Sequence, residues 1–416
     1  MAAAGEVHDP IAALRIANYR LFGAGFSCSS TGLQMLSTAV AWEVWERTHD
    51  PLELGYIGLA RALPVVLVAL PAGHLADLHD RRRIVAITQA AFALTAALLA
   101  VASAMHAPMW CFYLLLVMSG TVRAFNGPSR AGLLPLLVPE CAFGNAVTFN
   151  SGIFQSAAIL GPLAAGYIIG LTGLTWLAYA ACAVGCSVLS VTILFVKPHA
   201  AQRATGSMTF NSMLAGMGHL WRERTILGAI LLDLLAVLFG GATALLPLYA
   251  DEVLHVGPEG LGWLRAAPFI GALGVAGLIA LRPIRHAGAA LLWSVAGFGV
   301  CMVVFGLSTS MVLSMGALAM SGALDNVSVV VRHVLVQMRT PNQLRGRVGA
   351  VNSMFIECSN ELGGFESGLV ARMFGPVFSV VSGGIGTLVV VGAIAWGFPQ
   401  LRRLGKIEQV DQNPTP

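Results

Sequence analysis

The sequence predicts an all-α membrane protein with twelve transmembrane helices, and three observations lead to that prediction. Of the 416 residues, 56% are hydrophobic and only 11% are charged, whereas a soluble protein carries about 25% charged residues. Apolar runs of about 20 residues, the length that crosses a hydrocarbon core, recur along nearly the whole chain. The 47 glycines suit close contact between helices in a bilayer.

The apolar segments are expected to be helices, because backbone groups in lipid must form their hydrogen bonds within the segment. The predicted spans are 19–46, 53–76, 84–104, 109–127, 145–170, 174–196, 225–250, 261–281, 287–308, 311–331, 348–371 and 376–398. The longest polar interruption, 197–224, is a linker between a first half, 1–196, and a second half, 225–400. Apolar residues at helical spacing over 208–222 predict an amphipathic helix on the inner membrane face, and residues 401–416 form a polar tail.

The distribution of basic residues predicts the orientation of the chain. Most of the 24 lysines and arginines fall at the termini or in loops that follow even-numbered spans. Only Arg47 and Arg372 fall in the loops on the other side. By the positive-inside rule, both termini are cytoplasmic and the protein lies in a bacterial cytoplasmic membrane. The net charge of +4 is then a topology signal, and we expect no nucleic-acid partner.

The second half repeats the first. Arg61–Pro64 in the second span corresponds to Arg265–Pro268 in the eighth. Further along, Asn150 and Ser151 correspond to Asn352 and Ser353. The matches run in order through four helices, so we interpret the chain as two duplicated six-helix halves. In that architecture the binding site lies near the bilayer midplane, between the halves.

The loop between spans two and three has a motif of known type. Residues 73–83 read Gly-His-Leu-Ala-Asp-Leu-His-Asp-Arg-Arg-Arg. This resembles the signature of the major facilitator superfamily, at the loop where that family has it, except that Asp80 replaces the usual glycine. The resemblance implies the major facilitator fold and a gating loop formed by Gly73, Asp77, Arg81 and Arg82. Asp77 is expected to pair with cytoplasmic arginines and latch the two halves in one state.

Two further motifs resemble elements of the same superfamily. Arg123–Gly127 is similar to R-x-x-Q-G, with Asn126 for glutamine, an element that the family links to proton coupling. Gly161, Pro162 and Gly166 resemble the core of the motif associated with antiporters, although Tyr167 replaces its last glycine. The second resemblance implies export.

The resemblance can be narrowed to one branch. Leu134–Pro139 and Gln337–Val348 are similar to segments of the branch that holds enterobactin exporters and macrolide-efflux proteins. That branch spans siderophores and drugs, so the resemblance does not identify the substrate.

Ionisable side chains at membrane depth are rare and indicate functional sites. Glu357 and Glu361 are four residues apart and share one helix face, near the middle of their span. Glu366, on the opposite face, ranks lower. The residues expected to line a proton-coupling and substrate cavity are Asp233, Asp325, Glu357, Glu361, Arg61, Arg123 and Gln34.

A structural ion pair with an arginine is the alternative role for these aspartates. We favour function for Asp233, and for Asp325 the two roles are equally supported. Glu43 and Glu46, at the end of the first span, are expected to be solvated at the outer rim.

The sequence therefore favours a proton-coupled exporter of a small molecule, acting as a monomer with protons, substrate and the lipid bilayer as partners. One alternative is a proton-coupled importer of a small metabolite, and another is a membrane sensor or scaffold that does not transport. We expect no enzyme, because neither an HExxH motif nor a GxSxG motif with plausible partners occurs. No ATP-binding loop is found, and the cysteines lack metal-binding spacing, so no cofactor or metal is expected.

Overall fold

The computed structural model describes residues 11–197, 217–218, 220–221, 223–281, 286–341, 344–402 and 404–405. All regular structure in these residues is helical. The helices of the first half are α1 (Ala12–Arg15), α2 (Ala17–Thr48), α3 (Pro51–Leu78), α4 (Arg81–Ala104), α5 (Met109–Leu133), the short η1 (Leu134–Leu136), α6 (Glu140–Thr172) and α7 (Thr175–Phe195). Those of the second half are α9 (Arg224–Phe239), η2 (Gly241–Leu245), α10 (Leu246–Leu248), η3 (Tyr249–Val253), α11 (Gly257–Leu281), α12 (Ala287–Leu307), α13 (Met311–Arg339), α14 (Arg345–Phe374), α15 (Pro376–Gly397) and α16 (Pro399–Arg402).

Each predicted span coincides with one long helical segment of the described chain, the seventh being the interrupted run from α9 to η3. Nine of these segments are long and apolar enough, by length and composition, to cross a membrane. The other three, α2, α5 and α14, are long enough but include more polar residues. Two helices run well past their predicted spans: α5 reaches Leu133 and α13 reaches Arg339.

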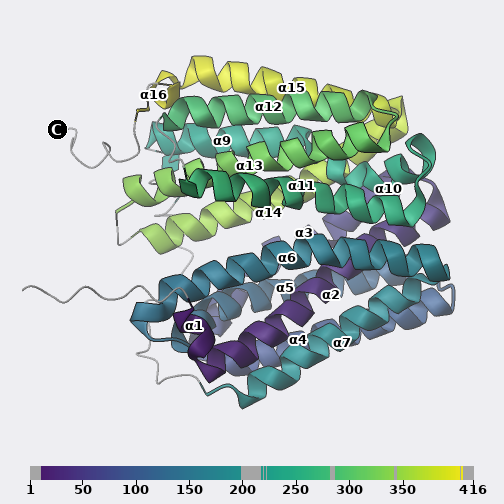
Figure 1. The fold of residues 1–416 in the computed structure, drawn as a ribbon, viewed down its shortest axis with the longest axis vertical. Helices are drawn as coiled ribbons and strands as arrows, with labels where there is room; N and C mark the ends of the chain where they lie inside the picture. Colours follow the sequence, from purple (N-terminus) through teal and green to yellow (C-terminus); the bar gives the residue numbers. More distant parts are fainter. Residues whose placement is uncertain are drawn as a thin grey trace, which may run out of the picture.

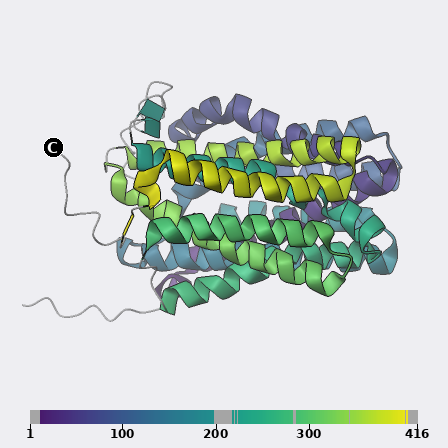
Figure 2. The same ribbon diagram turned by 90° about the horizontal axis from the view of Figure 1, so that it is seen from above.

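The helices form two bundles that lie side by side (Figure 1). In the view from above the second bundle lies in front of the first, and the long helices of both run in roughly the same direction (Figure 2). In the first bundle α2 packs on α6 and α7, while α4 packs on α5 and α7. In the second, α9 packs on α14 and α15, while α12 packs on α13 and α15. The packing order is the same in both, as a duplication requires.

The predicted linker and tail lie largely outside the described residues. Of the predicted amphipathic helix 208–222, the structure describes 217–218 and 220–221. Leu220 is buried there, against Ile226 and Val348. The boundaries of the predicted halves at 196 and 225 stay a prediction.

The two bundles meet along two helix pairs, α3 with α14 and α6 with α11. Glycines allow this approach. A Cβ on Gly58 would lie 2.9 Å from the carbonyl oxygen of Glu361, and one on Gly166 would lie 2.5 Å from that of Pro258. Such distances are too short for any larger residue without a shift of the backbone. Small residues therefore set the distance between the halves, as in membrane helix pairs generally.

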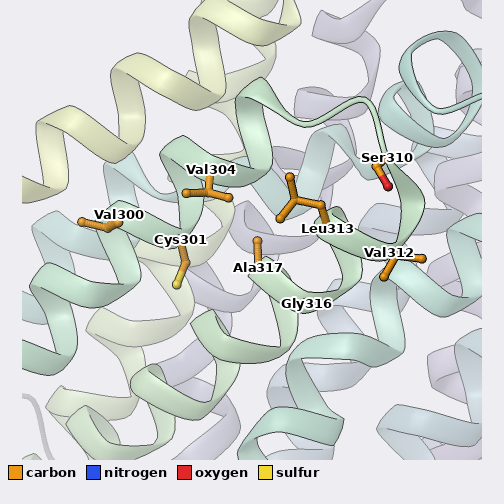
Figure 3. Close-up of a pocket in the computed structure, with 8 residues that line it drawn as sticks. All are labelled: Val300, Cys301, Val304, Ser310, Val312, Leu313, Gly316 and Ala317. Carbon is orange, nitrogen blue, oxygen red and sulfur yellow. The ribbon is translucent and has the colours of Figure 1, made fainter.

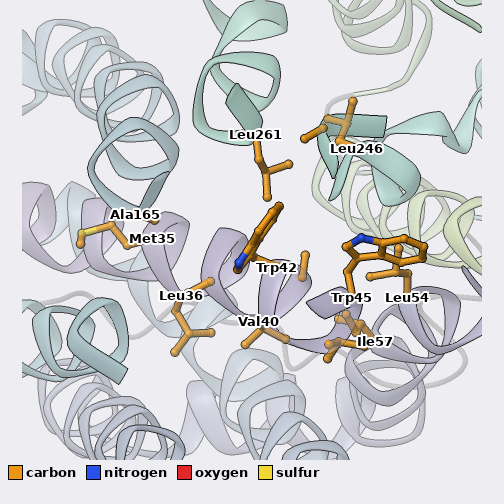
Figure 4. Packing of buried hydrophobic residues seen from close by; sticks show 14 of the residues in the cluster. Met35, Leu36, Val40, Trp42, Trp45, Leu54, Ile57, Ala165, Leu246 and Leu261 are labelled. Atoms are coloured by element: carbon orange, nitrogen blue, oxygen red, sulfur yellow. The ribbon is translucent and has the colours of Figure 1, made fainter. Parts of the chain in front are cut away.

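These contacts are concentrated at the end of the molecule remote from α16 (Figure 1). A buried apolar cluster fills that end (Figure 4), with Trp42 of α2, Leu246 of α10 and Leu261 of α11 among its members. Trp45 Nε1 donates a 3.0 Å hydrogen bond to Asp251 Oδ2. The halves are thus closed at this end.

At the opposite end, described side chains of the same interface helices are exposed. Leu67 and Leu78 near the end of α3 and Leu278 and Leu281 near the end of α11 are all more than half exposed. The bundles are therefore packed together at one end, and Figure 1 shows them further apart at the end where α16 lies.

Candidate functional site

A cavity of about 230 Å³ lies between the two halves, just beyond the point where Gly58 contacts Glu361. Helices α3 and α5 of the first half and α14 of the second enclose it. Its lining is unusually polar for membrane depth and consists of Arg61, Ala62, Val65, Val66, Arg123, Met354, Glu357, Cys358, Asn360 and Glu361. Two arginines from one half therefore face two glutamates from the other.

Arg123 and Glu357 form the one direct ion pair within this lining, with Arg123 Nη2 3.1 Å from Glu357 Oε1. The side chains are 53% and 44% exposed, so both lie at the open part of the cavity. An ion pair in contact with water contributes only about 0–1 kcal/mol. It can therefore be made and broken at little cost.

Glu361 lies one turn further along α14, at the closed end of the cavity. It interacts electrostatically with Arg61, Arg123 and Glu357, but makes no salt bridge with another described residue. Arg61 instead donates a 3.2 Å hydrogen bond from Nη1 to Ser37 Oγ on α2. The four charged residues thus form one electrostatic group that spans both halves.

Asp233 occupies a different environment. It forms an ion pair with Arg332, and both side chains are almost fully buried between α9 and α13. Neither lines the cavity. Asp325 is partly buried on α13 and has neither an ion pair nor a hydrogen bond with any described side chain.

The gating-loop residues are described in part. The side chain of Asp77 lies outside the described residues, and Gly73 is buried in α3. Arg81 Nη1 donates a 2.8 Å hydrogen bond to the carbonyl oxygen of Gly132, and Arg82 donates to that of Leu194. These bonds join the start of α4 to the ends of α5 and α7 in the same half, and the latch between halves stays a prediction.

Asp80, the departure from the family signature, has a local structural role. Its Oδ1 accepts a 2.9 Å hydrogen bond from the backbone N–H of Arg82. It is the N-cap of α4, and an aspartate there satisfies an otherwise unpaired backbone donor.

The antiporter-like residues set how closely α6 approaches its neighbours. A Cβ on Gly161 would lie 2.5 Å from Gln34 Cβ on α2, so the predicted cavity residue Gln34 packs against this motif. Gly166 approaches Pro258 of α11 in the other half, and the carbonyl oxygen of Pro162 faces Gly262. The motif therefore lies at the interface between the halves.

The prediction that Glu43 is solvated was wrong. The Glu43 side chain is almost fully buried, forms an ion pair with Arg47 and accepts a 2.7 Å hydrogen bond from Tyr179 Oη. Arg47 in turn donates to the carbonyl oxygen of Ala107 at 3.0 Å. Burial of these charges is tolerated because each has partners. The four-residue spacing of Glu43 and Arg47 was the feature of the sequence from which this ion pair could have been predicted. Glu46 is exposed, as expected.

A larger cavity, of about 440 Å³, lies between α12 and α13 (Figure 3). Its lining is apolar except for Ser310 and the thiol of Cys301. Val312 at its edge is 82% exposed, as expected for a side chain that faces lipid. Since no charged group reaches it, we do not assign a transport role to this cavity.

Comparison with known proteins identifies the family. Residues 8–416 match a family model described as a transmembrane secretion effector. The chain belongs to the major facilitator superfamily. This transporter is 24% identical to the multidrug efflux pump Tap of Mycolicibacterium fortuitum over 396 residues, 92% of this chain and 96% of that one. It is 22% identical to the enterobactin exporter EntS of Escherichia coli O1:K1 over 379 residues, 90% of each chain.

Solved structures support the same fold. The nucleoside transporter NupG has a TM-score of 0.67 at 13% identity and covers 93% of this transporter and 100% of its own chain. The D-xylose-proton symporter has a TM-score of 0.68 at 13% identity, with coverage of 91% and 97%. The predicted fold class is thereby confirmed, and the transporter is a multi-pass membrane protein.

Proposed function

We propose that this transporter is a proton-coupled exporter of a small molecule in a bacterial cytoplasmic membrane. Two six-helix halves, 1–196 and 225–400, move against each other about the cavity, and both termini face the cytoplasm. The observation that supports this most is the ion pair between Arg123 and Glu357, which joins the halves inside that cavity.

Protonation of Glu357 would remove the charge that holds Arg123. The solvent-exposed ion pair between Arg123 and Glu357 stabilises the contact by at most about 1 kcal/mol. One charge that crosses a membrane potential of 100 mV supplies about 2.3 kcal/mol. A single proton therefore has enough energy to break the pair. Glu361, one turn away among the same arginines, offers a second carboxylate to which the proton can pass.

The packed end and the separated end of the interface fit one step of such a cycle. With the termini in the cytoplasm, the separated end faces inward, so substrate and protons exchange with the cytoplasm in this state. Closing that end and separating the glycine contacts at Gly58 and Gly166 would expose the cavity to the other side, as alternating access requires.

Export is favoured over import by the relatives, which are named as an efflux pump and an exporter. Their names also favour a siderophore or a drug as substrate. Import is the alternative, and solved transporters of the same fold include a proton symporter. The direction is decided by everted vesicles, in which an exporter accumulates substrate when the interior is acidified and an importer does not.

The coupling residues can be tested in those vesicles with a panel of siderophores and drugs. A fluorescent pH dye reports protons that leave the acidified interior when a substrate is added. Glu357→Gln and Glu361→Gln should abolish this signal, yet retain exchange of labelled substrate across vesicles without a gradient. Glu366→Gln, on the same helix but outside the cavity, is the matched control and should behave as the unchanged protein. Full proton movement in both glutamine variants would exclude these carboxylates as the coupling groups.

A further inference from the structure

The two arginines that the repeat places at equivalent positions converge on one hydroxyl group. Arg61 Nη1 on α3 lies 3.2 Å from Ser37 Oγ, and Arg265 Nη1 on α11 lies 3.4 Å from the same atom. The two guanidinium groups come from different halves of the protein. Ser37 on α2 is therefore a bridge between the halves that is separate from the Arg123–Glu357 ion pair.

Arg265 differs from Arg61 in its charge environment. Arg61 has Glu361 nearby, whereas the charge that acts on Arg265 is the like charge of Arg61. No acidic side chain in the described part of the chain forms an ion pair with Arg265, and its buried Nε has no hydrogen-bond partner. A charge without a counter-charge is costly at membrane depth, and the second positive charge of Arg61 beside it adds to that cost.

The hydroxyl group of Ser37 also has a hydrogen-bond donor without an acceptor among the described residues. It accepts from both arginines, and no described group accepts a hydrogen bond from it. The cluster therefore offers two guanidinium groups and one O–H donor, and the side chains of Ser37, Arg61 and Arg265 are all partly exposed. By helix rise, Arg61 and Arg265 lie about 15 and 12 Å from the starts of α3 and α11, close to the middle of a hydrocarbon core about 30 Å thick.

We infer that Ser37, Arg61 and Arg265 form a binding site for an anionic oxygen group of the transported molecule, such as a carboxylate or a phenolate. Guanidinium groups form strong, paired hydrogen bonds with such oxygens, and an anion here neutralises the charge on Arg265 that the protein leaves unpaired. This inference rests on the proposed transport function and narrows its substrate to acids.

Equilibrium binding to the purified full-length protein tests this without any gradient. The probe is benzoate, with neutral benzamide as its isostere and sodium chloride at equal ionic strength as the salt control. Binding is measured as the rise in unfolding temperature with probe concentration. We expect benzoate to stabilise the protein and benzamide not to. Arg265→Gln should weaken the apparent affinity for benzoate at least about tenfold, as the loss of a charge-assisted hydrogen bond predicts.

Further variants keep the test decisive if Arg265→Gln folds poorly. Ser37→Ala and Arg265→Lys should each weaken benzoate binding by a smaller factor, because each leaves part of the donor set in place. Arg130→Gln is the control, since that guanidinium stacks on the Phe26 ring at 4.6 Å and should leave the affinity unchanged. Equal binding of benzoate and benzamide, no benzoate binding, or unchanged affinity in the Ser37 and Arg265 variants would overturn the inference. Benzoate binding in a protein that moves no protons would instead refute the proposed coupling and leave the anion site standing.

Discussion

Arg123 on α5 and Glu357 on α14 lie 3.1 Å apart and join the two halves of the transporter inside a water-accessible cavity. The repeat places the uncharged Gln155 of α6 at the position equivalent to Glu357, so α6 cannot form the equivalent ion pair on the other side of the interface. This asymmetry in charge allows the side of the interface formed by α5 and α14 to respond to protons. The other side, where α6 meets α11, keeps the close packing of its glycines.

Reversing the two charges of this pair should preserve the contact. Arg123→Gln alone leaves Glu357 without its partner and should reduce gradient-driven transport by up to about fivefold, the factor that corresponds to about 1 kcal/mol for an exposed ion pair. The exchange Arg123→Glu with Glu357→Arg should recover part of that loss, measured as uptake into everted vesicles. If the charge-reversed double variant transports no faster than Arg123→Gln, transport does not depend on the ion pair.

Asp233 should be needed for stability more than for coupling. Its carboxylate is buried with Arg332, and breaking a buried pair by removing one partner costs about 3–5 kcal/mol. Asp233→Asn should therefore lower the unfolding temperature of the purified protein clearly. The double variant Asp233→Asn with Arg332→Gln should be more stable than Asp233→Asn alone, since no charge is left unpaired. A single variant with unchanged stability but no proton movement would assign Asp233 to coupling.

The close approach of α6 and α11 should be required for closure of the packed end. A methyl group on Gly166 would lie 2.5 Å from the carbonyl oxygen of Pro258, so Gly166→Ala forces the halves apart there. We expect transport to fall severalfold, with the protein still folded by circular dichroism. Gly152→Ala on the same helix is the matched control, because nothing lies within 4 Å of its Cβ position. Equal transport by both variants would mean that closure does not depend on this contact.

The buried network around Glu43 should stabilise the first half. Glu43→Gln leaves Arg47 without its counter-charge and weakens the hydrogen bond from Tyr179, at a cost of about 3–5 kcal/mol for a broken buried pair. Tyr179→Phe removes only the hydrogen bond and should cost about 1–3 kcal/mol. Glu43→Gln should therefore lower the unfolding temperature more than Tyr179→Phe does. A larger decrease for Tyr179→Phe would contradict a stabilising ion pair between Glu43 and Arg47.

The helices and the cavity charges could be predicted from the sequence because both follow from the cost of polar groups in lipid. Apolar runs mark the spans, and ionisable residues inside them, such as Arg123 and Glu357, stand out against that background. The partner of Asp233 could not be predicted in this way. The predicted tenth span ended at residue 331, which assigned Arg332 to a loop, whereas α13 continues to Arg339 and buries it.

Ser37 illustrates a second limit of the sequence. A serine in an apolar helix is ordinary, because its hydroxyl can bond to the backbone of its own helix. Its position between Arg61 and Arg265 depends on how α2, α3 and α11 cross, which no local pattern specifies. The repeat indicated that the two arginines are equivalent, but not that they meet.

The coupling of proton and substrate movement is tested most directly by measuring both fluxes in the same proteoliposomes. A labelled substrate and an internal pH dye are followed together, with and without a protonophore, for the unchanged protein and for Glu357→Gln. The account predicts that substrate and protons move in opposite directions in the unchanged protein, and that Glu357→Gln exchanges substrate without moving protons. Substrate accumulation that continues at the same rate after the protonophore has collapsed the gradient would contradict it.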